Sequence, residues 1–137
     1  MIVTVDDRRL DVPDGATVLD AVNRAGIPLT QLCKDPDRPA LGACRTCLVH
    51  VDGMRGTPAA CHLPARDGMV VSTDHPEVMR VRSTVLDLTR SMLFAGESRG
   101  GSIPPRPTDF GQLGSALARH ARREPTWQPL HLSLIHI

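Results

Sequence analysis

The sequence predicts a small α+β domain that ends in a helix and is followed by a tail. Short alternating runs of β-branched residues, bounded by turn residues, indicate strands, and two longer segments repeat apolar residues at helical spacing. The core composition points the same way, because 41% of the residues are hydrophobic but only 2% are aromatic. The core of this domain must therefore be built from aliphatic side chains.

The N-terminal residues predict a β-hairpin. Ile2–Val5 alternates and is β-branched, and Arg8–Val12 alternates again, with its apolar residues on one face. Asp6-Asp7 supplies the turn between the two strands, and Pro13-Asp14-Gly15 ends the second one.

A first helix is expected to begin at Thr17, with Thr17 or Ala16 near its cap. Apolar residues recur at helical spacing from Val18 to Ala25, and Gly26, followed by a proline two residues later, ends the helix. A loop over residues 32–43 comes next, and a loop of this length without secondary structure is usually functional.

Two more strands and a second helix complete the predicted domain. Cys47–Val51 and Met69–Thr73 indicate strands, and each lies next to an Asp-Gly turn. The second helix is expected over residues 75–93, with Pro76 in its first turn. Its predicted apolar stripe consists of Val78, Val81, Val85, Leu88 and Met92.

The composition changes after Phe94. Residues 95–114 hold five glycines and three prolines among few large apolar side chains. We therefore place the folded domain in residues 1–94 and expect residues 95–137 to form a poorly ordered, Gly/Pro-rich basic tail, with a short helix over Ser115–Arg123.

The four cysteines of the chain follow one pattern, Cys33-x10-Cys44-x2-Cys47-x13-Cys61. Small residues flank them, so the backbone can come close enough for its N–H groups to face sulfur. One close pair flanked by two lone cysteines is the plant-type arrangement for a 2Fe–2S cluster. The spacing therefore predicts one 2Fe–2S cluster, with all four cysteines as its cofactor-binding, metal-ligating residues.

Other uses of cysteine fit the pattern less well. A structural zinc module would need a second Cys-x2-Cys pair, which Cys33 and Cys61 do not form. A disulfide pair is not expected in a reducing compartment. A Rieske site needs two cysteines and two histidines in paired spacing. His62 directly follows Cys61 and would point away from it on a strand, so we expect it at the surface or behind the ligands.

Three segments of the sequence resemble those of a known family. Residues 2–92 resemble the ferredoxin-like N-terminal domain of NAD-linked redox complexes. The family includes the molybdenum formate dehydrogenase alpha chain, the diaphorase subunit of NAD-reducing hydrogenases and the large subunit of NADH:quinone oxidoreductase. The matching segments are Gly42-Ala43-Cys44-Arg45-Thr46-Cys47-Leu48-Val49, Ala60-Cys61-His62-Leu63-Pro64 and Asp67-Gly68-Met69-Val70-Val71-Ser72-Thr73.

The resemblance implies a β-grasp fold, in which a small mixed sheet packs across one helix. It also implies that Cys33 pairs with Cys44 on one iron and Cys47 with Cys61 on the other. In the family a 4Fe–4S cluster usually follows, held by one histidine and three cysteines. Here the corresponding positions are Ser98, Ser102, Pro105 and Gly111, none of which is an effective ligand. We therefore expect a single cluster, in a fragment or in a form that lacks the second cluster.

The end of the chain supports the fragment hypothesis. Leu132–Ile137 fits no structural pattern and resembles the translation of a sequencing adapter. If these residues are an artefact, the natural protein continues beyond about residue 130; otherwise they form an apolar tail.

Charge and hydropathy exclude several classes of function. The net charge of +1 argues against nucleic-acid binding. No run of 18 apolar residues exists, so no membrane insertion is expected, and the N-terminus does not have the pattern of a signal peptide. We therefore expect a cytoplasmic protein.

The expected function is electron transfer. We expect the chain to relay single electrons as a domain or small subunit of a cytoplasmic NAD-linked oxidoreductase, with flavin- or molybdenum-containing subunits as partners. It has no Gly-x-Gly-x-x-Gly turn and no nucleophile with a base, so no substrate site of its own is expected. Cys44, Arg45 and Thr46 are predicted to form an exposed docking face. The alternatives are a stand-alone ferredoxin, a redox-sensing cluster protein and a structural zinc module.

Overall fold

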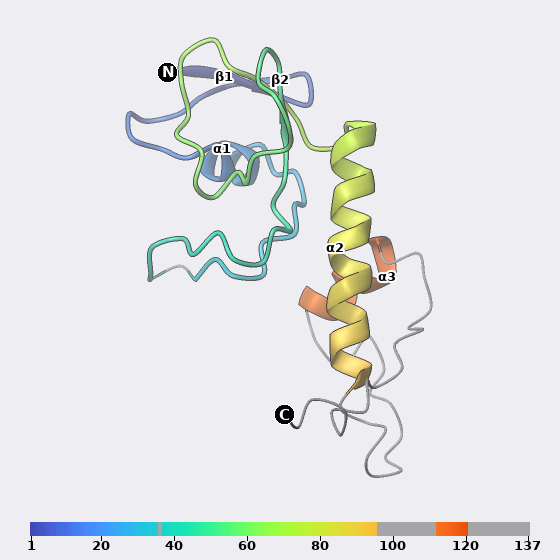
Figure 1. Cartoon of the computed structure of the whole chain (residues 1–137). Coiled ribbons are helices and arrows are strands. Elements are labelled where there is room, and N and C mark those ends of the chain that lie inside the picture. The colour runs from blue at the N-terminus through green and yellow to red at the C-terminus, as the bar shows by residue number, and fades with distance from the viewer. Residues whose placement is uncertain (36, 96–111, 121–137) are drawn as a thin grey trace, which may run out of the picture. The chain divides into compact units, whose positions relative to one another are not determined.

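The computed structural model describes residues 1–35, 37–95 and 112–120 (Figure 1). These residues fall into two compact units, Met1–Val85 and Leu86–Ile137, and helix α2 crosses the boundary between them. The strands are β1 (Ile2–Val5), β2 (Arg8–Asp11), β3 (His50–Val51) and β4 (Val70–Ser72), and the helices are α1 (Val18–Arg24), α2 (Pro76–Ala95) and α3 (Gln112–His120).

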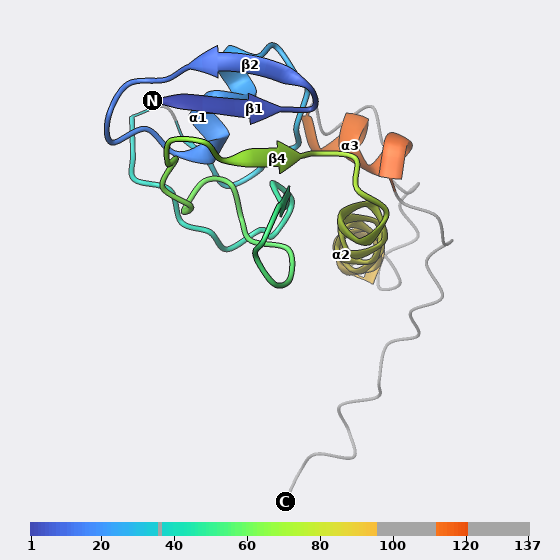
Figure 2. The same ribbon diagram turned by 90° about the horizontal axis from the view of Figure 1, so that it is seen from above.

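The first unit contains a mixed sheet with the strand order β2-β1-β4-β3. Strands β1 and β2 form the predicted antiparallel hairpin, with Val3 opposite Leu10. Strand β4 pairs parallel to β1 and antiparallel to β3. Helix α1 lies beneath β1 and β2 (Figures 1 and 2). This mixed four-stranded sheet with a helix packed against it confirms the predicted α+β, β-grasp fold.

The core of this unit is aliphatic, as the composition predicted. Val3 and Val5 point from β1 toward α1 and are fully buried. Val18, Leu19 and Val22 meet them from the helix and are also fully buried. Each such side chain stabilises the fold by about 1.5–3 kcal/mol through the apolar area that it removes from water. These contacts hold the helix on the sheet and so fix the start of the loop that follows α1.

Helix α1 begins where its capping residues allow. The Thr17 hydroxyl oxygen accepts from the Asp20 N–H at 3.2 Å, and the Asp20 carboxylate accepts from the Thr17 N–H at 2.8 Å. This reciprocal pair is a capping box, which satisfies donors that the first helical turn leaves free. At the other end the chain passes through Gly26 at a φ of 68°, which a glycine adopts without strain.

The third strand is shorter than predicted. We expected a strand over Cys47–Val51, but only His50 and Val51 pair with β4. The preceding residues pair instead with the segment before Cys61: the Ala60 N–H donates to the Cys47 carbonyl at 2.9 Å, and the Val49 N–H donates to the Pro58 carbonyl at 3.0 Å. The backbone before β3 therefore runs beside residues 58–60, and this brings Cys47 toward Cys61.

Helix α2 begins at Pro76, close to the predicted start, but its predicted apolar stripe is partly wrong. Val78 is fully buried, whereas Leu88 is 62% exposed. The buried position one turn after Val78 is held by Arg82, which is only 4% exposed. Residues four apart lie on one helix face. The buried face of α2 in the first unit therefore contains Val78 and Arg82 and does not follow the predicted apolar stripe.

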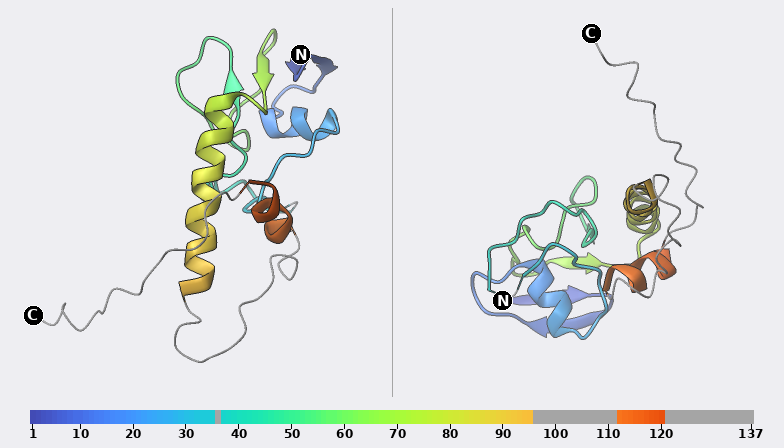
Figure 3. Two further views of the ribbon diagram at one scale, coloured as in Figure 1. Left: turned by 90° about the vertical axis from the view of Figure 1, so that its right-hand side faces the viewer. Right: turned by 90° about the horizontal axis from the view of Figure 1, so that it is seen from below.

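The second unit contains the end of α2 and helix α3, which Figure 3 shows from two further sides. Leu86 of α2 and Ala116 of α3 are fully buried. The short helix predicted over Ser115–Arg123 is present as α3, but it begins three residues earlier and is described only to His120. The four positions that correspond to the family's second cluster (Ser98, Ser102, Pro105 and Gly111) lie outside the described residues, as does Leu132–Ile137.

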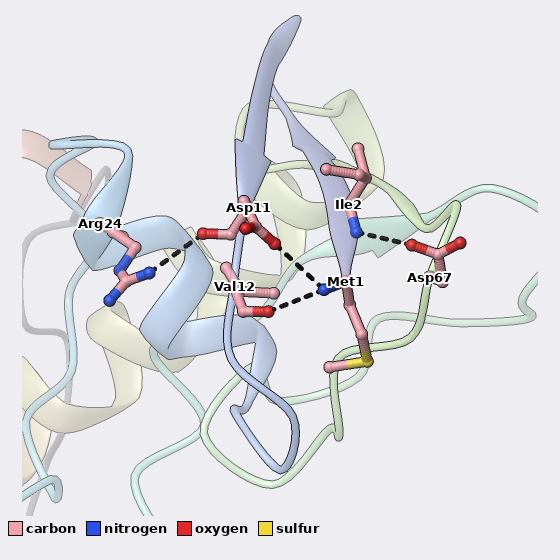
Figure 4. A network of polar contacts seen from close by, with 6 residues as sticks. All are labelled: Met1, Ile2, Asp11, Val12, Arg24 and Asp67. Atoms are coloured by element: carbon pink, nitrogen blue, oxygen red, sulfur yellow. Dashed lines mark hydrogen bonds and ion pairs between the residues drawn. The ribbon is translucent and has the colours of Figure 1, made fainter.

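The N-terminal residue is held by polar contacts at the edge of the hairpin (Figure 4). The Met1 ammonium donates to the Asp11 carboxylate at 3.1 Å and to the Val12 carbonyl at 3.0 Å. The hydrogen bond with Asp11 raises the pKa of this amino group above its ordinary value. The Ile2 N–H also donates to the Asp67 carboxylate at 2.6 Å, which ties β1 to the turn before β4.

None of the helices in the described ranges is both long and apolar enough to span a bilayer.

Candidate metal centre

The four cysteines lie on irregular backbone, outside the helices and strands. Cys33 follows α1, Cys44 and Cys47 precede β3, and Cys61 lies between β3 and β4. Cys33 and Cys44 are partly exposed, whereas Cys47 and Cys61 are buried, at 2% and 5% exposure. The loop predicted over residues 32–43 is present without helix or strand in its described part. One pair of thiols therefore lies near solvent and the other lies in the core.

Cys33 and Cys44 are brought together. Burial raises the pKa of the Cys44 thiol, but hydrogen bonds from the side chains and backbone of Thr46 and Cys33 outweigh it, so the pKa lies below its ordinary value. The Thr46 hydroxyl lies 3.0 Å from the Cys44 sulfur. Groups that lower a thiol pKa stabilise sulfur carrying negative charge, which is the form that binds metal.

Cys47 and Cys61 form the second pair. Burial raises the pKa of Cys47 to about 12, partly offset by a hydrogen bond from the Cys61 backbone. A hydrogen bond with the Cys61 thiol and the charges of Cys61 and Cys44 raise the pKa of Cys47 further. Only two residues separate Cys44 from Cys47, so the two pairs meet in one short stretch of the loop. A buried thiol with such a pKa stays protonated at neutral pH unless a metal ion replaces its proton.

Thr46 connects the two loops that carry the first pair. Its side chain is fully buried, and its hydroxyl contacts the Thr30 carbonyl at 3.3 Å and the Leu32 N–H at 3.4 Å in addition to Cys44. The prediction that Thr46 lies on an exposed docking face is therefore wrong. It fails because its hydroxyl satisfies backbone groups 14 and 16 residues away, which no local pattern in the sequence reveals.

Arg45 is exposed, as predicted, and adopts a left-handed backbone conformation. Its φ is 53°, which is uncommon for a residue with a side chain and costs about 1–2 kcal/mol. It lies between the partly exposed Cys44 and the buried Thr46, and its own side chain is exposed to solvent.

His62 is exposed but packs against the cysteine loop. A Cβ atom on Gly42, which has a φ of 65°, would lie 2.4 Å from the His62 ring. Only glycine leaves room for this ring without a shift of the side chain. The expectation of a surface residue beside the ligands thus fits its position, and the contact joins the segment of Cys61 to the segment of Cys44.

Arg82 is the site residue that the sequence analysis missed. Its guanidinium donates to the Thr46 carbonyl at 3.2 Å, to the Leu48 carbonyl at 2.6 Å and to the Thr73 carbonyl at 3.1 Å. The one available signal was an arginine four residues after the apolar Val78, on the face that the helix turns toward the domain.

A second group of potential metal ligands lies at the start of α2. Ligand atoms of His50, His75 and Glu77 lie within 4.8 Å of one another. The two imidazole rings, however, are stacked with their centroids 4.0 Å apart and their planes inclined by 11°. An imidazole binds metal in its ring plane, and two nearly parallel planes offer no shared point. The arrangement is therefore a stacking contact between β3 and the residue that precedes α2.

A pocket of about 330 Å³ opens beside Cys33. Its lining includes Cys33, Arg38, Pro39 and Leu41. Leu41 is 73% exposed, which is unusual for a leucine and places apolar surface next to the cysteine loop.

The donor set fits an iron–sulfur cluster. Four thiols converge in two pairs, and backbone groups of Cys33, Thr46 and Cys61 bond to the sulfurs of these pairs. Iron–sulfur clusters need this combination of thiolates and hydrogen bonds to sulfur.

Comparison with protein families identifies the N-terminal part of the chain. Residues 1–76 match a family model described as a 2Fe-2S iron-sulfur cluster binding domain. The matched segment includes all four cysteines.

Related proteins are components of redox complexes. The chain is 43% identical over 86 residues to a subunit of the NADH-quinone oxidoreductase of Rhizobium meliloti, and the match covers 63% of this chain and 10% of that protein. It is 32% identical over 85 residues to the gamma subunit of the NAD-reducing hydrogenase HoxS of Cupriavidus necator, and this match covers 62% of this chain and 36% of the hydrogenase protein. The matched segment therefore spans a minor part of each relative.

A solved structure shows the same fold. The crystal structure of an NAD⁺-reducing [NiFe]-hydrogenase in the H₂-reduced state contains a chain that superposes with a TM-score of 0.72 at 26% sequence identity. The match covers 94% of this chain and 52% of the hydrogenase chain.

Proposed function

Because the chain belongs to the family of 2Fe-2S iron-sulfur cluster binding domains, we propose that it relays single electrons within an NAD-linked oxidoreductase. The observation that carries this proposal is that one domain holds four thiols in two neighbouring pairs, one partly exposed and one buried, with the Thr46 hydroxyl 3.0 Å from the Cys44 sulfur. A 2Fe–2S cluster supplies reversible one-electron chemistry, and the protein sets its potential through burial and hydrogen bonds to sulfur.

The ligand assignment is part of the proposal. Cys33 and Cys44 would bind one iron, and Cys47 and Cys61 would bind the other. The pKa shifts support this grouping, because Cys33 contributes to the lowered pKa of Cys44 and Cys61 contributes to the shifted pKa of Cys47. We propose no ligand role for His62, whose ring is exposed and packs on Gly42.

The residues of the chain have distinct tasks in this proposal. The buried pair, Cys47 and Cys61, keeps water from one side of the site. The backbone groups of Cys33 and Thr46 that bond to Cys44 would stabilise the additional negative charge of a reduced cluster. The exposed pair forms the side on which a partner can approach closely.

The position of the docking face follows from the difference in exposure between the two cysteine pairs. Arg45 and Leu41 are exposed beside Cys44, whereas Thr46 is buried beneath it. We propose that electrons enter or leave through a surface that contains Arg45 and Leu41, with an acidic partner surface opposite the arginine. Such charge pairs raise the rate of association more than the affinity.

The proposed partners are flavin- or molybdenum-containing oxidoreductase subunits. The relatives from Rhizobium meliloti and Cupriavidus necator are named as subunits of an NADH-quinone oxidoreductase and of an NAD-reducing hydrogenase, and this supports a place in such a complex. We propose a cytoplasmic location for it. In this proposal the chain carries electrons and has no substrate site of its own.

Reduction through a flavoprotein tests the proposal. The purified holoprotein is first mixed with NADH and a catalytic amount of a flavin-containing diaphorase. Oxidised cytochrome c is added afterwards as the final one-electron acceptor. We expect the visible absorption of the cluster to bleach with one electron per chain and to recover when cytochrome c is added. A cluster that does not accept an electron reversibly would contradict the relay function, even if the iron content were correct.

A further inference from the structure

A buried arginine lies behind the metal centre and holds its backbone. Arg82 of α2 is 4% exposed. Its Nε donates to the Thr46 carbonyl at 3.2 Å, and its Nη2 donates to the Leu48 carbonyl at 2.6 Å. These two carbonyls belong to the residues on either side of Cys47. The guanidinium therefore holds the backbone at both sides of a buried thiol.

The same guanidinium is itself anchored to the sheet. Its Nη2 also donates to the Thr73 carbonyl at 3.1 Å, one residue after β4 ends. Its Nη1 lies 3.5 Å from the sulfur of Met79 on the same helix. Arg82 thus links the cysteine loop, 34 to 36 residues away, to the end of β4 and the first turns of α2.

The planarity of the peptide bond gives these contacts a directional effect. In a trans peptide the C=O and the following N–H point in opposite directions. The Leu48 carbonyl points to Arg82, and the next N–H, of Val49, points away and donates to Pro58 at 3.0 Å. By the same rule, the bond from Arg82 to the Thr46 carbonyl fixes the N–H of Cys47 on the side away from the arginine.

We propose that Arg82 is a positioning residue for the 2Fe–2S cluster. By holding the carbonyls of Thr46 and Leu48, it sets the orientation of Cys47 and of the peptide N–H groups around it. These groups decide how strongly the environment of the sulfurs stabilises the reduced cluster. This inference rests on the proposed ligand role of Cys47. It assigns an influence on the reduction potential of the cluster to a residue that acts only through the backbone.

Substitution of Arg82 tests this role in the full-length holoprotein. In Arg82→Lys a single ammonium nitrogen replaces the Nε and Nη2 donors, so it cannot reproduce the fork that holds both carbonyls. Arg82→Met removes the donors altogether. Both variants should have a more negative midpoint potential than the wild-type protein. The potential falls because loosened N–H groups stabilise the reduced cluster less. Both variants should also lose iron to a chelator several times faster, because the backbone on either side of Cys47 is held less firmly.

The matched control is Arg80→Met. Arg80 is exposed on the same helix, so this variant removes the same formal charge without touching the cysteine loop. Its midpoint potential and its rate of iron loss should equal those of the wild-type protein. The potential is the decisive measurement, since a residue that only stabilised the fold would lower the melting temperature without shifting the potential of the folded protein.

The Lys variant decides the result if Arg82→Met does not fold. A midpoint potential of Arg82→Lys equal to that of the wild-type and Arg80→Met proteins would overturn the positioning role. Failure of Arg82→Lys to fold would overturn it too, in favour of a role in the core alone. The proposed relay function fails separately, if the wild-type protein itself holds no cluster that can be reduced reversibly.

Discussion

At the residue scale, the four thiols of the chain differ in their surroundings. Cys47 is buried with its pKa raised to about 12, whereas hydrogen bonds from Thr46 and Cys33 outweigh burial at Cys44 and lower its pKa. In the proposed ligand assignment, iron binding displaces a proton from Cys47 at neutral pH, and the free energy of binding is coupled to folding. We therefore expect the site to be most sensitive to changes in the buried pair.

Replacement of Cys47 by serine should abolish the cluster or leave it unstable. A serine oxygen is a harder and poorer iron ligand than a thiolate, and the buried position offers no water to take its place. We expect loss of visible absorption and a lower melting temperature. The control Ala43→Ser introduces the same hydroxyl at an exposed position of the loop and should leave the cluster intact. A wild-type spectrum in Cys47→Ser would mean that Cys47 is not a ligand.

Reversal of charge at Arg45 should slow electron transfer without altering the cluster. The side chain is exposed beside Cys44, so Arg45→Glu would repel an acidic partner surface. We expect an unchanged visible spectrum and a several-fold slower rate of electron transfer from the physiological donor at low salt. Arg9→Glu, on the outer strand β2, makes the same change of charge away from the cysteine loop and serves as the control. Equal rates in the two variants would place docking on another face.

What the sequence reveals at this scale depends on the range of the interaction. The spacing of the four cysteines is local, and it was sufficient to predict the 2Fe–2S cofactor. Arg82 and Thr46 could not be identified in this way. The backbone carbonyls that Arg82 contacts lie 9 to 36 residues away from it in the sequence. The contacts of Thr46 with Leu32 and Thr30 span 14 and 16 residues.

At the scale of single elements, local sequence signals predicted where the helices and strands lie better than they predicted which of their faces are buried. Of the two residues predicted near the cap of α1, Thr17 is the observed cap, and the predicted turn of the first hairpin is present. The third strand was predicted too long because residues 58–60 compete for its backbone hydrogen bonds. The stripe of α2 was shifted because the buried position at Arg82 is polar, and an analysis of apolar periodicity passes over it.

Removal of the cap of α1 should destabilise the domain by about 1 kcal/mol. In Thr17→Ala the Asp20 N–H loses its acceptor, and the Asp20 carboxylate loses the 2.7 Å bond from the hydroxyl. Thr17→Ser keeps both interactions and is the matched control. Chemical denaturation of the two variants, both with the cluster bound, measures the difference. If they unfold at the same denaturant concentration, the capping box does not contribute to stability.

At the scale of the whole molecule, the packing supports a self-sufficient N-terminal domain. The buried core and the hydrophobic residues packed against it extend from Met1 to Val81. The family match covers residues 1–76. We therefore propose that residues 1–94, including the helix over residues 75–93, form the ferredoxin-type domain, and that residues 95–137 contribute little to its folding.

A chain that ends at Gly96 tests this division. It retains every core residue of the first unit and all four cysteines. We expect it to bind the cluster with an unchanged spectrum and a melting temperature close to that of the full chain. If the shortened chain fails to fold, later residues belong to the core and the boundary is misplaced.

The central claim is that the four cysteines hold one 2Fe–2S cluster that carries one electron. The most direct measurement is electron paramagnetic resonance of the dithionite-reduced full chain, with spins and iron quantified on the same sample. The account predicts a half-integer spin signal that integrates to one spin per chain and two irons per spin, absent from the oxidised protein. Stoichiometric zinc with no such signal, or four irons per spin, would contradict it.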